Sequence, residues 1–512
     1  MRNGPSSIER ERRCNSQLDD RETKMPAENS DDLDANESLD PSDWSEFRRE
    51  AHALLDDLIG HIEGIRRQPV WRAAPEDTRA HFARSTPGKG RPLRDVADDI
   101  RADVMPFATG NLHPRFMGWV HGAGTPVGML AEMIAAGLNM NCGGRDHIGI
   151  EVERQIVRWM RDAFDYPDSA TGLFLTGSSM ANFLAVIIAK VEAIGETTRV
   201  AGLSGDARRL VAYASKASHG CISQAMEISG IGSANLRLID IDASGALRPD
   251  ILHDAIAADR AAGFHPFLIV ATAGTVNIGA IDPLLDISSI AERERLWFHV
   301  DGAIGALAIF SEKLRHLIKG IEASHSIALD FHKCGHVPYD AGFLLVRDGA
   351  AHKRAFAQSN SYLQRADRGL AAGETWPCDL GPDLSRGFRA LKTWVTIETL
   401  GAERLGASMA HTCTLAIYLA DRVKQSELFE LYAEPTLNIV CFGLRGRQDR
   451  INRELVLDLH ESGIAAPSWT EIDGRCLIRC AIINHRTTHD DIDAFLAALV
   501  SFTERRLNAE ET

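Results

Sequence analysis

The 512-residue sequence lacks several features that would place it in other classes of protein. No apolar run reaches the roughly 18–20 residues of a membrane-spanning helix, and the N-terminus has no apolar segment of a secretory signal. Positive charge is scarce, with 56 Lys and Arg against 71 Asp and Glu, so the net charge of −15 argues against nucleic acid and membranes as partners. The nine cysteines form no CxxC pair and no zinc-type cluster, which predicts no metal site and a cytoplasmic protein.

Residues 1–42 nearly lack aromatic side chains and are rich in Ser, Asp, Glu, Asn and Arg. Such a composition cannot bury enough apolar surface to offset the entropy of ordering, so we predict a disordered tail. The next segment has apolar residues at helical spacing and begins at a capping residue, which is Asp40, Ser42 or Asp43. We assign residues 43–120 to an N-terminal helical extension.

Between about 125 and 345, short apolar runs alternate with segments of helical periodicity. This alternation predicts an α/β fold with a mainly parallel sheet covered by helices on both faces, in a large domain of residues 121–383. From 384 to 512 the pattern changes to two long helices, two strands and a last helix, which predicts a small α+β domain. The predicted strands of the large domain are 210–213, 236–239, 267–272, 297–300 and 326–329.

Two charged residues follow apolar strands of the predicted sheet. Asp301 ends one strand at the carboxyl edge, where open α/β sheets bind ligands, although a single Asp there is more often only a cap. Lys333 follows another strand, and an ammonium group against a core is costly unless it has a partner or a reduced pKa. A lysine desolvated in this way suits Schiff-base chemistry.

Two further features complete a set. Ser178 and Ser179 open an apolar helix after a strand, so the free N–H groups and the helix dipole suit a phosphate, although Gly-Ser-Ser is also a common helix cap. His219 follows a strand, where a lone histidine is usually only a loop residue. Together, a phosphate cradle, a carboxylate for a pyridine nitrogen, a lysine for an aldehyde and a flat group for a ring describe pyridoxal 5′-phosphate.

The stretches around these residues resemble the group II pyridoxal-phosphate-dependent amino acid decarboxylases, a family that includes aromatic-L-amino-acid and glutamate decarboxylases. The resemblance covers about 45–500, and its motifs occur in the matching order. It implies a fold-type I, aspartate aminotransferase-like architecture and a homodimer with shared active sites, in which the N-terminal extension wraps the partner. The matching stretches are 113–116, 177–182, 271–282, 299–303, 331–342, 361–363 and 384–394, together with His219.

By position, the resemblance implies a role for each candidate residue. Lys333 matches the lysine that forms the Schiff base, Asp301 the carboxylate paired with the pyridine nitrogen, and His219 the residue stacked on the ring. Many relatives have Asn where this chain has Asp330, and Trp where it has Cys334. The other cofactor contacts implied by the resemblance are Ser178, Ser179, Thr275, Ala303, Asp330 and His332.

Tyr362 matches the catalytic-loop tyrosine that protonates Cα, in the neighbouring subunit's site. Aldehyde-forming relatives tend to have Phe there, so Tyr favours decarboxylation of an L-amino acid to an amine and CO₂. The alternatives are an aldehyde synthase, a carbon–carbon lyase of the same fold, and a noncatalytic relative that binds cofactor or partners.

The substrate-side residues are harder to assign. His121 lies in a stretch that resembles the family's substrate-side loop. Asn141 and Arg145 lie where aromatic decarboxylases have apolar pocket residues, so they either contact a more polar substrate or form hydrogen bonds at a dimer interface. Arg145 suits a side-chain carboxylate, and equally an ion pair with Asp146 or a glutamate.

Overall fold

The computed structural model describes residues 38–205, 209–358, 364–373, 375–446 and 449–510. Its helices are α1 Trp44–Gly64, α2 Glu76–His81, α3 Leu93–Asp99, α4 Pro126–Leu138, α5 Ile148–Ala163, α6 Ser178–Ile194, α7 Thr198–Ala201, α8 Cys221–Ile228, α9 Pro249–Ala261, α10 Leu284–Glu294, α11 Gly349–Phe356, α12 Arg389–Leu400, α13 Ala402–Gln425, α14 Asp449–Ser462 and α15 His489–Glu510. Its strands are β1 Thr171–Leu175, β2 Leu210–Ser215, β3 Leu236–Ile239, β4 His265–Thr272, β5 Trp297–Asp301, β6 Ser326–Asp330, β7 Gly342–Val346, β8 Phe429–Leu431, β9 Ile439–Leu444, β10 Ser468–Ile472 and β11 Arg475–Ala481.

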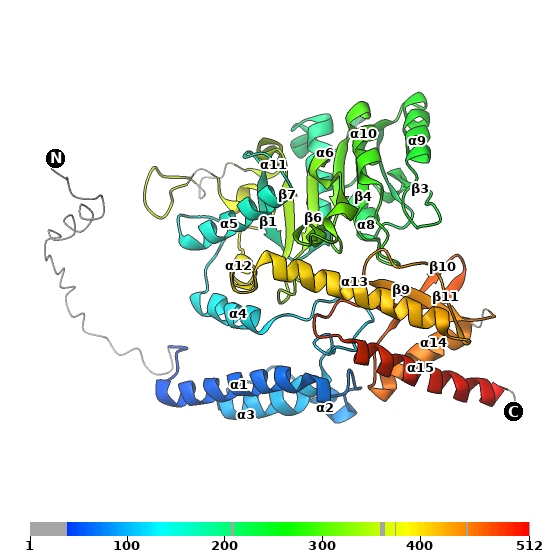
Figure 1. The fold of residues 1–512 in the computed structure, drawn as a ribbon. Coiled ribbons are helices and arrows are strands. Elements are labelled where there is room, and N and C mark those ends of the chain that lie inside the picture. Colours follow the sequence, from blue (N-terminus) through cyan, green and yellow to red (C-terminus); the bar gives the residue numbers. More distant parts are fainter. Residues whose placement is uncertain (1–37, 206–208, 359–363, 374, 447–448, 511–512) are drawn as a thin grey trace, which may run out of the picture.

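A seven-stranded sheet forms the centre of the larger body, in the order β1-β7-β6-β5-β4-β2-β3 (Figure 1). All five strands expected in the large domain are present, and they pair in parallel from β3 to β6. The sheet is mixed, because β7 is antiparallel to both β6 and β1. The predicted α/β class is therefore confirmed, with the antiparallel β7 lying between β6 and the edge strand β1.

Helices cover both faces of this sheet, and alternate strand residues serve the two faces. In β2, Val211 and Tyr213 join a core with α5, α9 and α10, whereas Ala212 and Ala214 join a core with α6 and α8. Nearly every residue of β2, β4, β5 and β6 is buried, as expected for parallel strands enclosed by helices.

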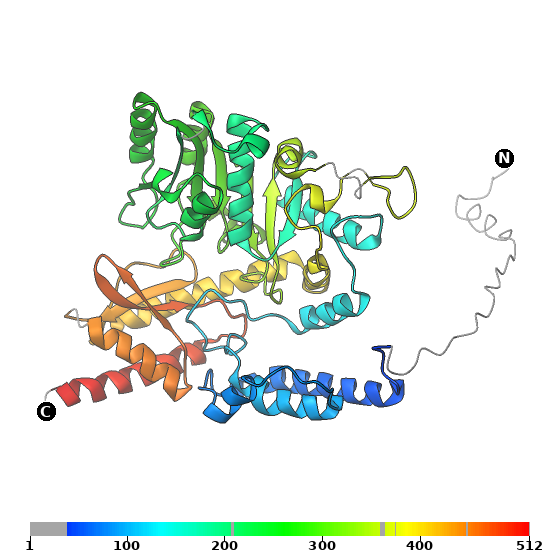
Figure 2. The same cartoon turned by 180° about the vertical axis from the view of Figure 1, so that it is seen from behind.

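A second, antiparallel sheet of order β10-β11-β9-β8 packs with α13, α14 and α15 in the smaller body (Figure 2). The sequence pattern of β11 predicts a half-buried strand, and this expectation is wrong. Leu477 and Ala481 join the core of the large sheet while Ile478 and Cys480 pack towards α14 and α15, so both faces are covered.

Helices α1 and α3 pack together in a layer that lies apart from the large sheet in both views (Figures 1 and 2). Of the three capping candidates, Asp43 takes the role: its Oδ1 accepts hydrogen bonds from the backbone of Ser45 at 2.8 Å and Glu46 at 3.0 Å. Most of the predicted tail lies outside the described residues. Within them, no helix combines the length and hydropathy needed to cross a bilayer.

The helix predicted to begin at 384 begins at Arg389 instead. Before it, the backbone of Arg386 bonds to the 141–143 segment: its N–H donates to Asn141 Oδ1 at 3.0 Å, and its carbonyl accepts from Cys142 at 2.7 Å. These long-range bonds hold the irregular segment before Arg389 outside the helix. Helix α12 packs on α4 and α5, whereas α13 contacts β8 and β9, so the segment after residue 383 contacts both bodies. The domain limits at 120 and 383 therefore stay predictions.

Candidate active site

A cavity of about 370 Å³ lies at the carboxyl ends of the parallel strands. Asp301 ends β5, Asp330 ends β6, and Lys333 follows three residues later. His219 lies beyond β2, and Ser178 begins α6 after β1. The fold thus brings together residues that are distant in sequence at the sheet edge where ligands bind. The predicted site residues that line the cavity are His121, Ser178, Ser179, His219, Asp301, Ala303, Asp330, His332 and Lys333.

Lys333 reaches the cavity with a partner in place. Its Nζ lies 2.8 Å from Asp330 Oδ2, and the same carboxylate accepts the backbone N–H and the hydroxyl of Ser178, both at 2.7 Å. Burial acts to lower the pKa of Lys333, but the charges of Asp330 and Asp301 outweigh it and the pKa is raised. Burial acts to raise the pKa of Asp330, but Lys333 and His332 outweigh it and that pKa is lowered. A lysine against the core needs either a charged partner or a reduced pKa, and Lys333 has a charged partner.

Asp301 is almost fully buried, and both its oxygens are held. Oδ1 accepts the backbone N–H of Ala303 at 3.2 Å, and Oδ2 accepts Asn182 Nδ2 at 3.1 Å. Burial raises the pKa of Asp301, and the nearby charge of Lys333 opposes that rise. The site therefore holds a buried carboxylate with both oxygens fixed, in the same cavity as the ammonium group of Lys333.

Two histidines border this pair. His219 Nδ1 accepts the backbone N–H of Cys221 at 3.1 Å, and His332 Nδ1 accepts that of Ala341 at 3.0 Å. A nitrogen that accepts from a backbone N–H carries no proton, so each neutral ring has its proton on Nε2. His332 Nε2 lies 3.7 Å from Asp330 Oδ1. Burial lowers the pKa of His332, which keeps this ring neutral near pH 7.

The opposite side of the cavity is lined by rings. His121 stacks on Trp119 with centroids 6.0 Å apart, and it meets Tyr339 edge-on at 6.2 Å. Trp119 and Tyr339 remain 50% and 48% exposed, so this side is open. The loop passes close to the lysine: a Cβ at Gly122 would lie 2.1 Å from the carbonyl oxygen of His332. Burial, and then the charge of Lys333, lower the pKa of His121.

Arg479 reaches the cavity from β11 of the smaller body. Its guanidinium is buried and donates to the carbonyl of Val276 from Nε at 3.1 Å and Nη2 at 2.6 Å, and to that of Gly118 from Nη1 at 2.7 Å. Within the described ranges, no carboxylate pairs with it. A buried cation held only by carbonyl and hydroxyl oxygens is a candidate for an anionic ligand.

Three predicted residues are not brought into this cavity. Thr275 is buried behind it, where its hydroxyl accepts the backbone N–H of Ala280 at 2.9 Å. Asn141 is exposed, and its Oδ1 accepts from Gly143 and Arg386. Arg145 lies 4.7 Å over the ring of Trp376. Tyr362 lies outside the described residues.

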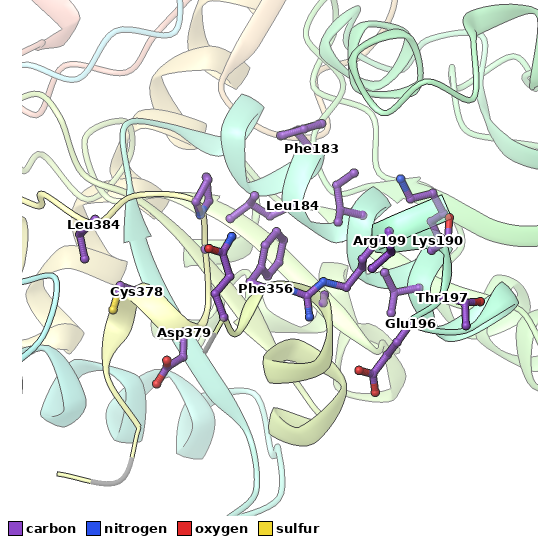
Figure 3. A pocket seen from close by; sticks show the side chains of 18 residues that line it. Phe183, Leu184, Lys190, Glu196, Thr197, Arg199, Phe356, Cys378, Asp379 and Leu384 are labelled. Carbon is purple, nitrogen blue, oxygen red and sulfur yellow. The ribbon is translucent and has the colours of Figure 1, made fainter. Parts of the chain in front are cut away.

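A second, wider cavity of about 930 Å³ lies between α6, α7, α11 and the short helix Pro377–Asp379 (Figure 3). Of its four labelled charged side chains, Lys190, Glu196 and Asp379 do not converge on one point. Arg199 is committed to the carbonyls of Arg354 and Ala357. This cavity therefore has no convergent chemistry.

Three side chains with metal-ligand atoms, those of His81, Asp99 and Asp103, lie close together near α2 and α3. His81 Nε2 lies 3.2 Å from Asp99, and its Nδ1 lies 3.0 Å from Asp103. Asp99 also pairs with Arg91, and Thr78 donates to Asp103 at 3.0 Å. These groups satisfy one another, so they do not argue for an ion.

Comparison with known proteins assigns most of this chain to one family. The pyridoxal-dependent decarboxylase conserved domain matches residues 75–445. The chain belongs to this decarboxylase family. The aromatic-L-amino-acid decarboxylase of Bacillus atrophaeus is 28% identical over 474 residues, covering 90% of this chain and 96% of the relative. The phenylacetaldehyde synthase of Arabidopsis thaliana is 29% identical, covering 87% and 93%.

The fold similarity extends further. The solved structure of Oryza sativa TDC with PLP and tryptamine superposes with a TM-score of 0.84 at 24% identity, covering 92% of this chain and all of that one. The decarboxylase is thus a pyridoxal-phosphate-dependent carboxy-lyase of the predicted architecture. The family resemblance expected from the motifs is confirmed.

The cavity of the decarboxylase fits pyridoxal phosphate on its own geometry. Thr272 Oγ1 is buried in its wall without a hydrogen-bond partner among the described residues. A Cβ at Gly177 would project beside the start of α6, 3.7 Å from His332, so glycine keeps that space open. An orphaned hydroxyl, an open helix start and a lysine with its carboxylates suit a phosphorylated, polar ring.

Sequence reasoning missed the supporting residues Asn182, His299, Tyr339 and Arg479. Two of them carried a readable signal: Asn182 is one helical turn after Ser178, and His299 is two strand positions before Asp301, so each shares a face with a predicted residue. Arg479 and Tyr339 carried none, because their place depends on how the smaller body and a loop pack against the large sheet.

Proposed function

We propose that the decarboxylase converts an L-amino acid to its amine and CO₂, with Lys333 as the residue that would hold the aldehyde group of pyridoxal phosphate. The observation that carries this proposal is the shared cavity of Lys333 and Asp301, which follow or end two neighbouring parallel strands. Pyridoxal phosphate, when bound, withdraws electrons from the Cα of the amino acid attached to it. The chain's residues would bind, orient and protonate around that chemistry.

The roles follow from the contacts. Asp301 would keep the ring nitrogen protonated, and Ser178 and Ser179 would hold the phosphate at the start of α6. His219 would stack on the ring. Asp330 would orient Lys333, since its carboxylate holds Nζ at 2.8 Å. The further cofactor contacts proposed are Ala303 and His332, whereas Thr275 lies outside the cavity and is not proposed as one.

The substrate would be an aromatic L-amino acid. The rings of Trp119, His121 and Tyr339 line the open side of the cavity, and a flat side chain packs well among such rings. Arg479 would bind a carboxylate of the substrate, because it is a buried cation in the wall with no acidic partner in the described ranges.

A panel of L-amino acids tests the proposal, with amine detected by mass spectrometry. We expect aromatic amino acids to give amine and acidic ones to give little or none. Efficient conversion of glutamate or aspartate would contradict the substrate class. A purified protein without an absorbance band of lysine-bound cofactor would contradict the proposal itself.

An aldehyde synthase is the second candidate, because a relative with that printed name is 29% identical to this chain. Tyr362 favours the amine, since its phenol would protonate Cα before oxygen reacts there. General acids of this kind contribute roughly 10²–10⁴-fold. Tyr362→Phe should therefore divert flux to aldehyde, ammonia and hydrogen peroxide. Equal oxygen uptake by both proteins would refute the role of Tyr362, and stoichiometric uptake by wild type would favour the synthase.

We also propose a homodimer, in which α1 covers a partner. Leu58 and Ile59 of α1 are 40% and 45% exposed, an apolar surface that its own chain leaves open. In sedimentation, Leu58→Asp should yield monomers, while the exposed polar control Glu63→Gln and a deletion of residues 1–40 should remain dimeric. A fully active wild-type monomer would contradict this. The eight described cysteines are unpaired, in keeping with the proposed cytoplasmic location.

A further inference from the structure

A chain of four side-chain hydrogen bonds leads through the buried core to Asp301. Trp297 Nε1 lies 2.9 Å from Ser326 Oγ, and Ser326 Oγ lies 2.8 Å from His299 Nδ1. His299 Nε2 lies 2.7 Å from Asn182 Oδ1, and Asn182 Nδ2 lies 3.1 Å from Asp301 Oδ2. The three middle members are completely buried, so water does not compete for these bonds.

The chemistry of the ends determines the direction of every bond. An ionised Asp301 only accepts, so Asn182 must turn its amide N–H towards it and its oxygen towards His299. His299 must then carry its proton on Nε2, which leaves Nδ1 to accept the hydroxyl proton of Ser326. That hydroxyl oxygen accepts from Trp297, whose indole only donates. All the donors therefore point towards Asp301.

The opposite direction is also available, but it needs a different Asp301. The carbonyl of Ser326 lies 3.1 Å from His299 Nδ1 and would accept a proton placed there. His299 Nε2 would then accept from Asn182, whose oxygen would face Asp301. Two oxygens meet without repulsion only if Asp301 is protonated. The hydroxyl of Ser326 can donate to His299 Nδ1, which makes the direction that suits an ionised Asp301 available.

We propose that His299 and Asn182 are positioning residues, which hold Asp301 as an ionised carboxylate aimed at the ring nitrogen of the cofactor. The inference rests on the proposed role of Asp301. Neither residue lines the cavity, so each acts only through the carboxylate. Asn182 is fixed on both sides, because its Nδ2 also lies 3.3 Å from Cys221 Sγ. Burial lowers the pKa of His299 to about 3, which keeps the ring neutral as the chain requires.

The test compares two ligands that differ at one atom. Protein stripped of cofactor is titrated with pyridoxal phosphate and with an analogue whose ring nitrogen is replaced by C–H, and the two dissociation constants are measured by equilibrium dialysis. Wild type should prefer pyridoxal phosphate. His299→Leu should free Asn182 to turn away from Asp301 and reduce that preference by roughly 10- to 100-fold, the range for losing the hydrogen bond from Asn182 to the charged carboxylate.

Two controls separate positioning from general damage. His299→Gln keeps an N–H that reaches Asn182 and should retain most of the preference. His352→Leu removes another fully buried histidine, bonded to Thr171 and outside the chain of bonds, and should leave the preference at the wild-type value. If melting of the cofactor-free protein shows that His299→Leu does not fold, Asn182→Leu replaces it.

The outcomes distinguish the inference from the proposed function. An unchanged preference in folded His299→Leu or Asn182→Leu would overturn the positioning role while leaving Asp301 in place. Equal affinity of wild type for both ligands would overturn the role of Asp301 itself, and with it the inference. An equal loss of preference in His352→Leu would show a general packing effect and would also overturn it.

Discussion

The two sides of the cavity differ in how they are built. The cofactor wall consists of Ser178, His219, Asp301, Asp330 and Lys333, and each lies at or just beyond a strand end or at a helix start. Within it, Lys333 and Asp301 have hydrogen-bond or ion-pair partners from the same chain. The substrate wall consists of Trp119, His121, Tyr339 and Arg479, which come from loops and from the smaller body.

This difference separates cofactor binding, which one subunit supplies, from substrate choice, which depends on further contacts. The cofactor wall is positioned by the buried sheet, so cofactor binding needs little else. The substrate wall has two half-exposed rings. Asn141 and Arg145 do not reach its cavity, because Asn141 bonds to Arg386 and Arg145 lies over the ring of Trp376. Substrate choice therefore depends on whatever closes the open side.

The strongest break of the cofactor wall is Lys333→Ala. We expect complete loss of the absorbance band of bound cofactor and of amine formation, because no other lysine lines the cavity among the described residues. Lys190→Ala, at a lysine outside this cavity, should retain both. Borohydride reduction followed by peptide mapping identifies the lysine that carries the cofactor. A label on a different lysine would contradict the assignment of Lys333.

Asp301→Asn should have the next largest effect. Removing one partner of a buried charge pair costs about 3–5 kcal/mol, which corresponds to roughly 10²–10⁴-fold in kcat/KM. The cofactor should still attach to Lys333. Asp259→Asn is the matched control, since Asp259 is a buried acid paired with Arg237 away from the cavity. Near-normal turnover of Asp301→Asn would refute the pairing with the ring nitrogen.

On the substrate wall, Arg479→Lys should weaken the binding of the amino acid substrate by roughly 10- to 100-fold, the range for losing a hydrogen bond to a charged group. The single nitrogen of lysine cannot span the carbonyls of Val276 and Gly118 and also keep a donor for a carboxylate. The amine product lacks the α-carboxylate, so its inhibition constant should stay near the wild-type value. Equal weakening of both ligands would indicate a structural role only.

The smallest effect is expected for Arg145→Ala, at about 10-fold or less, for a contact made across a dimer. Mixing inactive Lys333→Ala subunits with Arg145→Ala subunits sharpens the comparison. If Arg145 serves the partner's cavity, mixed dimers combine an intact lysine with an intact arginine and activity rises. No rise on mixing, with dimer exchange verified by mass, would place Arg145 outside the substrate wall.

Much of the cofactor wall was readable from the sequence because its signals are local. A charged residue directly after an apolar run marks a strand end, as at Asp301, and small residues before an apolar helix mark a helix start, as at Ser178. Strand positions followed from the same runs. The apolar runs did not predict the order β1-β7 at the sheet edge or the burial of both faces of β11. Both depend on the segments that pack against these strands.

The sequence by itself determined the fold class, the family motifs and the residues at the strand ends. Only the tertiary structure decided their neighbours: Asn182 meets Asp301 across 119 positions, Arg479 enters from the smaller body, and Thr275 turns away from the cavity. Periodicity and motifs report the environment of a residue along its own segment. Contacts between distant segments arise from packing and buried hydrogen bonding, which no local pattern encodes.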